Sequence, residues 1–206
     1  MPFESNIFIN CPFDKKYDPI LKAVIFCIVY LQYKPLLSEI INSANSRVSG
    51  ILDLISQAKY SIHDLSRMES TQKNELARFN MPFELGMDIG CKRFGNNLQK
   101  EKCFLILDKI KYRYQKSISD ISGNDISVHH EEPEKALRNV RNWIRKISGD
   151  HIASANKIWR LFNEYNGDFY ELAEKDELSD EDIEEMPWDE YCFYIEQWLE
   201  GRKNFQ

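Results

Sequence analysis

The chain has 206 residues, of which 33 are acidic and 27 are lysine or arginine, so its formal net charge is −6. This length suits one domain with an appendage, and an acidic chain offers no basic surface that would favour nucleic-acid binding. No apolar run approaches the roughly 20 residues of a membrane span, and the first residues lack the basic region of an export signal. These features favour a cytoplasmic protein with no membrane attachment and no nucleic-acid partner.

The cysteines and histidines favour neither disulfides nor a metal site. Five cysteines are present, an odd number, and none belongs to a C-x-x-C pair or to a close cluster with histidine. Disulfide frameworks and zinc sites need such spacings. The adjacent His129 and His130 have no third ligand candidate beyond Glu131 and Glu132. We therefore expect no metal and no cofactor.

Short apolar runs alternate with segments of helical periodicity over residues 1–147. Predicted strands cover residues 6–11, 35–40, 59–67 and 102–108, and predicted helices cover residues 18–31, 50–58, 80–94 and 132–147. Residues 112–126 are rich in turn formers, with a further short strand as an option. The alternating order predicts an α/β domain with a flavodoxin-like or Rossmann-like, doubly wound parallel sheet.

The helix predicted from Asn80 carries an unusual polar stripe. Asn80 suits an N-cap, and Pro82 falls in the first turn, where its missing N–H costs nothing. Asn80, Glu84 and Asp88 recur every four residues on one face, and apolar residues cover most of the rest. Two glycines, Gly86 and Gly90, are expected to let a buried helix approach its neighbours closely. The stripe is either functional or simply solvated.

Residues 148–206 form a second region with a different composition. Residues 171–190 contain eleven acids and one lysine, and a run of like charge is usually a solvated linker. Aromatic residues follow at helical spacing from Trp188. We expect a helical, acidic C-terminal extension, whose aromatic helix packs either on the main domain or on a partner protein.

The carboxyl ends of the predicted strands bring polar residues together. Ligands of open α/β sheets bind beyond these ends, so the segments 10–17 and 64–67, Arg47 and the helix start at Asn80 should converge. The set holds carboxylates, arginines, amides and aromatic rings, but no serine or cysteine nucleophile with a histidine and no glycine-rich phosphate loop. Kinase, NTPase and nicotinamide-dehydrogenase chemistry are therefore disfavoured.

A carboxylate in such a site suits cleavage of an N-glycosidic bond, because it stabilises a developing oxocarbenium ion or attacks C1′. Glu84 is the candidate for this role, the alternative being an acid favoured by the helix dipole. Asp64 would orient the ribose or the base, or else serve as a strand-end turn residue. Arg47 and Arg67 would bind phosphates. The other candidate substrate contacts are Asn10, Pro12, Phe13, Asp14, Tyr17, Ser66, Asn80 and Met81, with Phe13 or Tyr17 stacking on the base. His63 is interpreted as a structural histidine.

These residues carry a resemblance to a known group. The motifs Ile9-Asn10-Cys11-Pro12-Phe13-Asp14 with Tyr17, Arg47, Tyr60 to Arg67, Phe79 to Gly86, Tyr112 to Lys116 and Ile118 to Ile126 resemble those of poorly characterised bacterial proteins. That group is similar to nucleoside 2-deoxyribosyltransferases and, more distantly, to TIR domains. The resemblance covers roughly residues 6–147, and the first-strand segment departs from both families, so base and sugar specificity do not carry over.

The resemblance implies a catalytic role for Glu84. In the deoxyribosyltransferases an Asn-x-x-x-Glu-Leu-Gly-type helix carries the nucleophilic glutamate, and Glu84 occupies that position. It further implies a nucleotide or NAD as substrate, assembly into homo-oligomers, and, by analogy with bacterial relatives, a toxic role in phage defence. The alternative is a nucleotide-sensing module that lost the reaction and signals to a partner or self-assembles.

Overall fold

The strands are short apolar runs that form one parallel sheet. The structure, a computed structural model, describes residues 2–38, 47–70, 77, 79–121 and 126–203. All residues of the first and third strands are buried, as expected where helices cover both faces of a parallel sheet. The strands are β1 (Asn6–Asn10), β2 (Lys34–Leu37), β3 (Tyr60–Asp64), β4 (Cys103–Asp108) and β5 (Ile126–Val128), in the order β2-β1-β3-β4-β5.

This topology confirms the predicted α/β class. Ile7 pairs with Pro35 of β2 on one side and with Tyr60 of β3 on the other, so the chain reverses its direction of winding around β1. The strand order is the one found in flavodoxin-like sheets, where the point of reversal lies between β1 and β3. The optional strand is present as β5, which begins at the last residue of the predicted range, Ile126, and continues beyond it to Val128.

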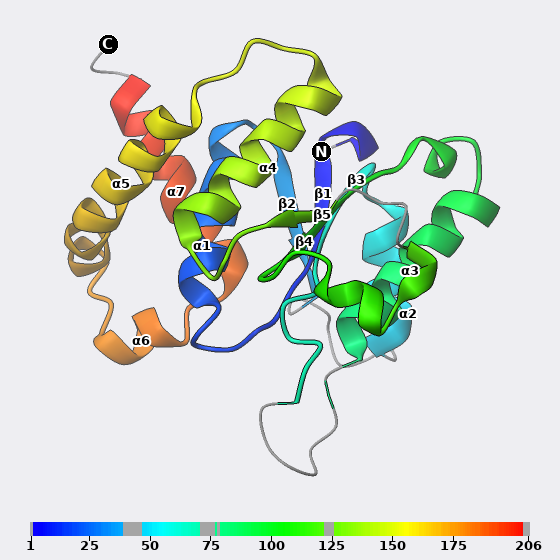
Figure 1. The fold of residues 1–206 in the computed structure, drawn as a ribbon. Helices are drawn as coiled ribbons and strands as arrows, with labels where there is room; N and C mark the ends of the chain where they lie inside the picture. Colours follow the sequence, from blue (N-terminus) through cyan, green and yellow to red (C-terminus); the bar gives the residue numbers. More distant parts are fainter. Residues whose placement is uncertain (1, 39–46, 71–76, 78, 122–125, 204–206) are drawn as a thin grey trace.

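Helices cover the two faces unequally (Figure 1). The helices α1 (Asp18–Tyr30) and α4 (Pro133–Ser148) lie on one face, with α5 (Ala155–Lys175) and α7 (Trp188–Lys203) outside them. The helices α2 (Arg47–Ser56) and α3 (Asn80–Phe94) cover the other face. The short α6 (Asp180–Glu184) links α5 to α7, and four 3-10 turns complete the described chain at η1 (Phe3–Ser5), η3 (Gln99–Glu101), η4 (Arg113–Lys116) and η5 (Ser119–Ile121).

The C-terminal helices share the main hydrophobic core with α1. Phe26 of α1 lies 5.5 Å from Phe162, 5.6 Å from Tyr165 and 6.1 Å from Trp198, measured between ring centroids. Aromatic rings at such separations attract each other in addition to burying apolar area. Of the two placements expected for the aromatic C-terminal helix, the structure shows packing on the main domain.

The acidic run is solvated as predicted, but much of it is not a linker. Its acids are exposed, while residues 171–175 continue α5 and residues 180–184 form α6. Ser179 and Asp182 form a reciprocal capping box at the start of α6, which satisfies two backbone N–H groups. Capping and acids in the first turn outweigh the repulsion expected of a charge run.

Some predicted boundaries require correction. Asn80 is the first residue of α3, and Phe79 occupies the cap position without a side-chain bond, so Asn80 is not the N-cap. The pair Asp18-Pro19 also predicts an N-cap at Asp18, but Asp18 is the first residue of α1 and Tyr17 occupies the cap position. Arg47, predicted in a loop, is the first residue of the described α2. The predicted strand end at 39–40 and the loop at 41–46 lie outside the described residues.

Of the two interpretations of the polar stripe on α3, solvation does not hold for its two carboxylates. Glu84 is only 7 % exposed and Asp88 is fully buried, whereas Phe83 is 58 % exposed. A Cβ added at Gly86 or Gly90 would meet nothing within 4 Å, so neither glycine serves close packing. Asp88 faces the sheet, where His63 of β3 and Lys102, just before β4, are its buried partners.

Candidate functional site

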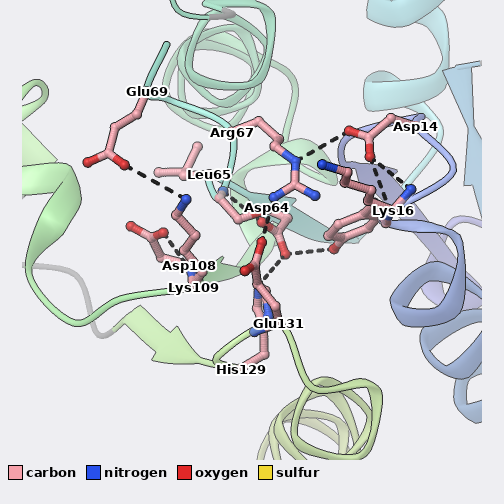
Figure 2. Close-up of polar contacts among 12 residues, drawn as sticks. Asp14, Lys16, Asp64, Leu65, Arg67, Glu69, Asp108, Lys109, His129 and Glu131 are labelled. Carbon is pink, nitrogen blue, oxygen red and sulfur yellow. Dashed lines mark hydrogen bonds and ion pairs between the residues drawn. The ribbon is translucent and has the colours of Figure 1, made fainter. Parts of the chain in front are cut away.

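The candidate site lies at the carboxyl edge of the sheet, around the reversal point between β1 and β3 (Figure 2). The loop after β1, the end of β3, the end of β4 and the turn after β5 all reach this edge, as the topology requires. Residues far apart in sequence, such as Asp14, Asp64 and Glu131, therefore come together. The prediction that segments 10–17 and 64–67 converge is confirmed.

Asp64 is the buried hub of this edge. Its Oδ2 accepts a hydrogen bond from the Tyr17 hydroxyl at 2.6 Å and lies 2.9 Å from His129 Nε2. Its Oδ1 accepts from the backbone N–H of Ser66 at 2.8 Å. Burial alone would raise the pKa of Asp64, but the partners, His129 first, outweigh it and hold the pKa below its usual value. The hub is therefore an ionised carboxylate whose two oxygens are both taken by protein donors.

The state of the His129 ring follows from its neighbours. The backbone N–H of Glu131 donates to His129 Nδ1 at 3.0 Å, so Nδ1 must carry a lone pair. The ring proton then lies on Nε2, which faces Asp64. This arrangement joins the turn after β5 to the end of β3 and, through Tyr17, to the start of α1.

Arg67 lies above this hub with two carboxylates. Its Nε lies 3.3 Å from Asp14 Oδ2, and its Nη1 donates to Glu131 Oε1 at 2.7 Å. Asp14 Oδ1 also accepts from the backbone N–H groups of Lys16 and Tyr17, both at 3.2 Å. The guanidinium thus bridges the loop after β1 and the turn after β5.

Arg113 closes the edge between β3 and β4. Its Nη2 donates to the Leu65 carbonyl at 2.6 Å and to Asp108 Oδ1 at 2.5 Å. Nη1 of the same residue lies 3.3 Å from Glu69, which also lies 3.8 Å from Lys109. Both Asp108 and Arg113 are buried, so this group is a structural tie between two strand ends.

A second buried network runs from β1 to α3. Asn10 Nδ2 donates to the Met81 carbonyl at 2.8 Å and contacts His63 Nδ1 at 3.0 Å. Since Met81 supplies an acceptor, the Asn10 atom is the amide nitrogen, and its second hydrogen points to an unprotonated Nδ1. His63 Nε2 then carries the proton and donates to Asp88 Oδ2 at 3.0 Å. This supports the interpretation of His63 as a structural histidine.

The network ends at Lys102, which is fully buried. Its ammonium lies 3.2 Å from Asp88 Oδ1 and donates to the carbonyls of Ile55, at 2.8 Å, and Ala58. Burial would raise the pKa of Asp88, but His63 and Lys102 together lower it. These four side chains, linked in the order Asn10, His63, Asp88 and Lys102, are called the buried relay below.

Glu84 lies on α3 between the two anchored positions, Met81 and Asp88. Among the described residues no hydrogen bond reaches its carboxylate, although it is nine-tenths buried. Burial raises the pKa of Glu84 to about 7, against the opposing charge of Arg47. Glu84 is thus a desolvated acid that titrates near neutral pH, and the exposed Arg47 is its electrostatic neighbour.

The other predicted site residues divide into three groups. Asn10, Pro12, Tyr17 and Ser66 are buried in the edge. Tyr17 is only 2 % exposed and packs against His129, so its ring is not available for base stacking. Phe13 and Asp14 line a pocket of about 590 Å³ that residues 184–189 complete. Met81 contributes its carbonyl, and Asn80 is exposed.

Sequence reasoning missed His129, Glu131, Arg113 and the relay partners Asp88 and Lys102 as members of the site. His129 directly follows β5, so the edge rule would have indicated it had that strand been placed. Arg113 belongs to a motif noted for the resemblance but not given a role. No local pattern indicates Lys102, because its partners lie 14 to 47 positions away.

The sequence matches no protein-family model, and no curated protein matches it significantly. Within the described ranges, no group of three or more histidine, cysteine, aspartate or glutamate side chains is arranged to hold a metal ion. Across those same ranges, none of the helices has the length and apolar character needed to cross a membrane.

Proposed function

We propose that this protein is a cytoplasmic enzyme that cleaves or transfers at the N-glycosidic bond of a nucleotide, with NAD as the leading substrate. The observation that carries the proposal is Glu84, a desolvated carboxylate without hydrogen-bond partners among the described residues and with a pKa of about 7. A catalytic group works best when its pKa lies near the operating pH. The resemblance to deoxyribosyltransferases and TIR domains supports the same assignment.

In the proposed reaction a Glu84 oxygen attacks C1′ of the bound ribose or stabilises its oxocarbenium character. The C1′–N bond breaks, and the base departs with the bonding electrons. Water or an acceptor base then attacks C1′ and frees Glu84 where a covalent intermediate has formed. Burial favours this step, since a carboxylate shielded from water interacts more strongly with developing positive charge.

In this proposal the hydrogen bonds around α3 hold Glu84 in position relative to the sheet. Asn10 and Asp88 tie α3 to β1 and β3 three residues before and four residues after Glu84, which limits its movement relative to the sheet. Asp64 is a positioning residue, because protein donors occupy both of its oxygens. Arg67 and Arg47 are the candidate phosphate ligands. The proposal includes assembly into homo-oligomers. A toxic role in phage defence is what the resemblance implies.

The test is release of free base. The purified chain is incubated with nucleosides, nucleotides and NAD, and products are identified by mass spectrometry. Glu84→Gln should lower turnover at least about a hundredfold, while Glu171→Gln, an exposed acid on α5, should not. Wild-type turnover should rise as pH increases through about 7, as Glu84 ionises. Undiminished turnover in Glu84→Gln would remove the assignment.

A nucleotide-binding module without catalysis is the second candidate, and one observation favours it. Arg67 and Arg113 each already bind carboxylates, so a phosphate that binds either guanidinium competes with a protein side chain. Such a competition suits a sensor that changes conformation on binding, with the C-terminal extension as a contact for a partner. Nucleotide binding in calorimetry without base release, and insensitive to Glu84→Gln, would favour this candidate over the enzyme.

A further inference from the structure

The two carboxylates on Arg67 are held in different ways. Asp14 uses one oxygen for Arg67 and the other for the backbone N–H groups of Lys16 and Tyr17, so the loop itself fixes it. Glu131 is 54 % exposed, and within the described chain only Arg67 binds its carboxylate. Glu131 is therefore the partner that a competing anion displaces more easily.

The backbone below Glu131 is held in an uncommon conformation. His130 and Glu131 have φ values of 53° and 59°, in the left-handed region that residues other than glycine adopt rarely and at an energetic cost. The turn is fixed from below, because the Glu131 N–H donates to His129 Nδ1 and His129 contacts the buried Asp64. This turn presents the Glu131 carboxylate to Arg67 (Figure 2).

Arg67 has binding capacity to spare. A guanidinium carries five N–H donors in a planar fork that matches the oxygens of carboxylates and phosphates. Its contacts with described residues use Nε and Nη1, and its side chain is 21 % exposed. Removal of Glu131 would therefore leave several donors directed at solvent while Asp14 kept the guanidinium in place.

We propose that Arg67 is a binding site for a phosphate or pyrophosphate group and that Glu131 occupies this site in the free protein as an internal competitor. The arriving anion replaces Glu131 on the guanidinium, and the carboxylate moves into solvent. The turn at 130–131 keeps the bond from the Glu131 N–H to His129 Nδ1, so only the side chain of Glu131 has to move. The inference rests on the proposed function for the ligand class, a nucleotide, and adds the regulation of its binding.

Calorimetry with inorganic pyrophosphate at low ionic strength tests the proposal without any turnover. Glu131→Gln should bind pyrophosphate roughly two- to fivefold more tightly than the wild type, the upper part of the range expected for loss of one partly exposed ion pair. Glu132→Gln is the matched control, since it removes the same charge one residue later from a carboxylate paired with Lys135. Its affinity should equal that of the wild type, and Arg67→Gln should lose binding.

Equal affinities of Glu131→Gln and Glu132→Gln would overturn the proposal, as would full binding by Arg67→Gln or no binding by any variant at millimolar pyrophosphate. Base release, measured separately on the same proteins, reports on the proposed function. Suppose that base release depends on Glu84 but the pyrophosphate affinities are equal. The role of Glu131 as a competitor would then be rejected, and the proposed enzymatic function would stand. Tighter binding by Glu131→Gln without base release by the wild type would do the reverse.

Discussion

The buried relay and the Arg67 ion pairs both connect polar side chains from distant parts of the sequence, yet they differ in what surrounds them. Asn10, His63, Asp88 and Lys102 are almost completely buried, and neighbouring groups determine the position of each side-chain proton. Around Arg67 the side chains are 21 to 54 % exposed, and several donors are unused by described residues. Loss of one partner leaves a buried charge unpaired, so the relay specifies structure. The ion pairs of Arg67 with Asp14 and Glu131, which we call the rim, suit exchange with a ligand.

The largest loss of stability is expected from a substitution that breaks the buried relay. Lys102→Met removes the ammonium beside Asp88 and leaves the Ile55 and Ala58 carbonyls without their donor. Loss of one partner of a buried ion pair should lower the free energy of unfolding by about 3 to 5 kcal/mol. Chemical denaturation measures this, with the exposed Lys100→Met as control, for which we expect about 0.5 kcal/mol or less. A loss below about 1 kcal/mol would contradict the distinction between relay and rim.

Glu84 offers a second test, because it is buried like the relay but lacks its partners. Its pKa, raised from 4.5 to about 7, means that the folded state binds the proton more tightly than the unfolded state does. Wild-type stability should therefore fall as pH rises from about 4.5 to above 7, by about 3 kcal/mol from this group. Gln resembles the neutral acid and removes this dependence.

We thus expect Glu84→Gln to match the wild type near pH 4 and to exceed it by up to about 3 kcal/mol at pH 8. Urea denaturation across this pH range measures the difference, and the exposed Glu171→Gln should follow the wild type throughout. Parallel curves for Glu84→Gln and wild type would show that the carboxylate is solvated or paired. A stability gain combined with lost turnover would be the signature of a strained functional acid.

The fold was largely predictable because periodic apolar patterns carry it. Residues 6–10 and 103–108 are short apolar strands, and Asp18-Pro19 marks a helix start to within one residue. The alternation of strands and helices then implied a parallel sheet and predicted which segments meet at its carboxyl edge. Asp14, Tyr17, Asp64 and Arg67 meet there.

The charged partners were not predictable from local patterns. The carboxylate stripe on α3 reads as solvated or functional, and only the fold places His63 and Lys102 beside Asp88. On the same helix Phe83 is exposed, because the side that carries Glu84 and Asp88 is the buried one. The turn at His129 to Glu131 follows a strand of three residues, which is too short to give a periodic signal.

The smallest expected effect concerns the Asp64 hub, which is buried like the relay yet lies directly below the rim. Tyr17→Phe removes the 2.6 Å hydrogen bond to Asp64 Oδ2, but His129 and the Ser66 N–H remain. The free energy of unfolding should therefore fall by about 1.5 kcal/mol, as for one bond to a charged acceptor, with the exposed Tyr170→Phe as an unaffected control in urea denaturation. A loss of unfolding free energy as large as that of Lys102→Met would mean that His129 and the Ser66 N–H do not compensate for the missing hydroxyl. Asp64 would then depend on every one of its partners, as the residues of the buried relay do.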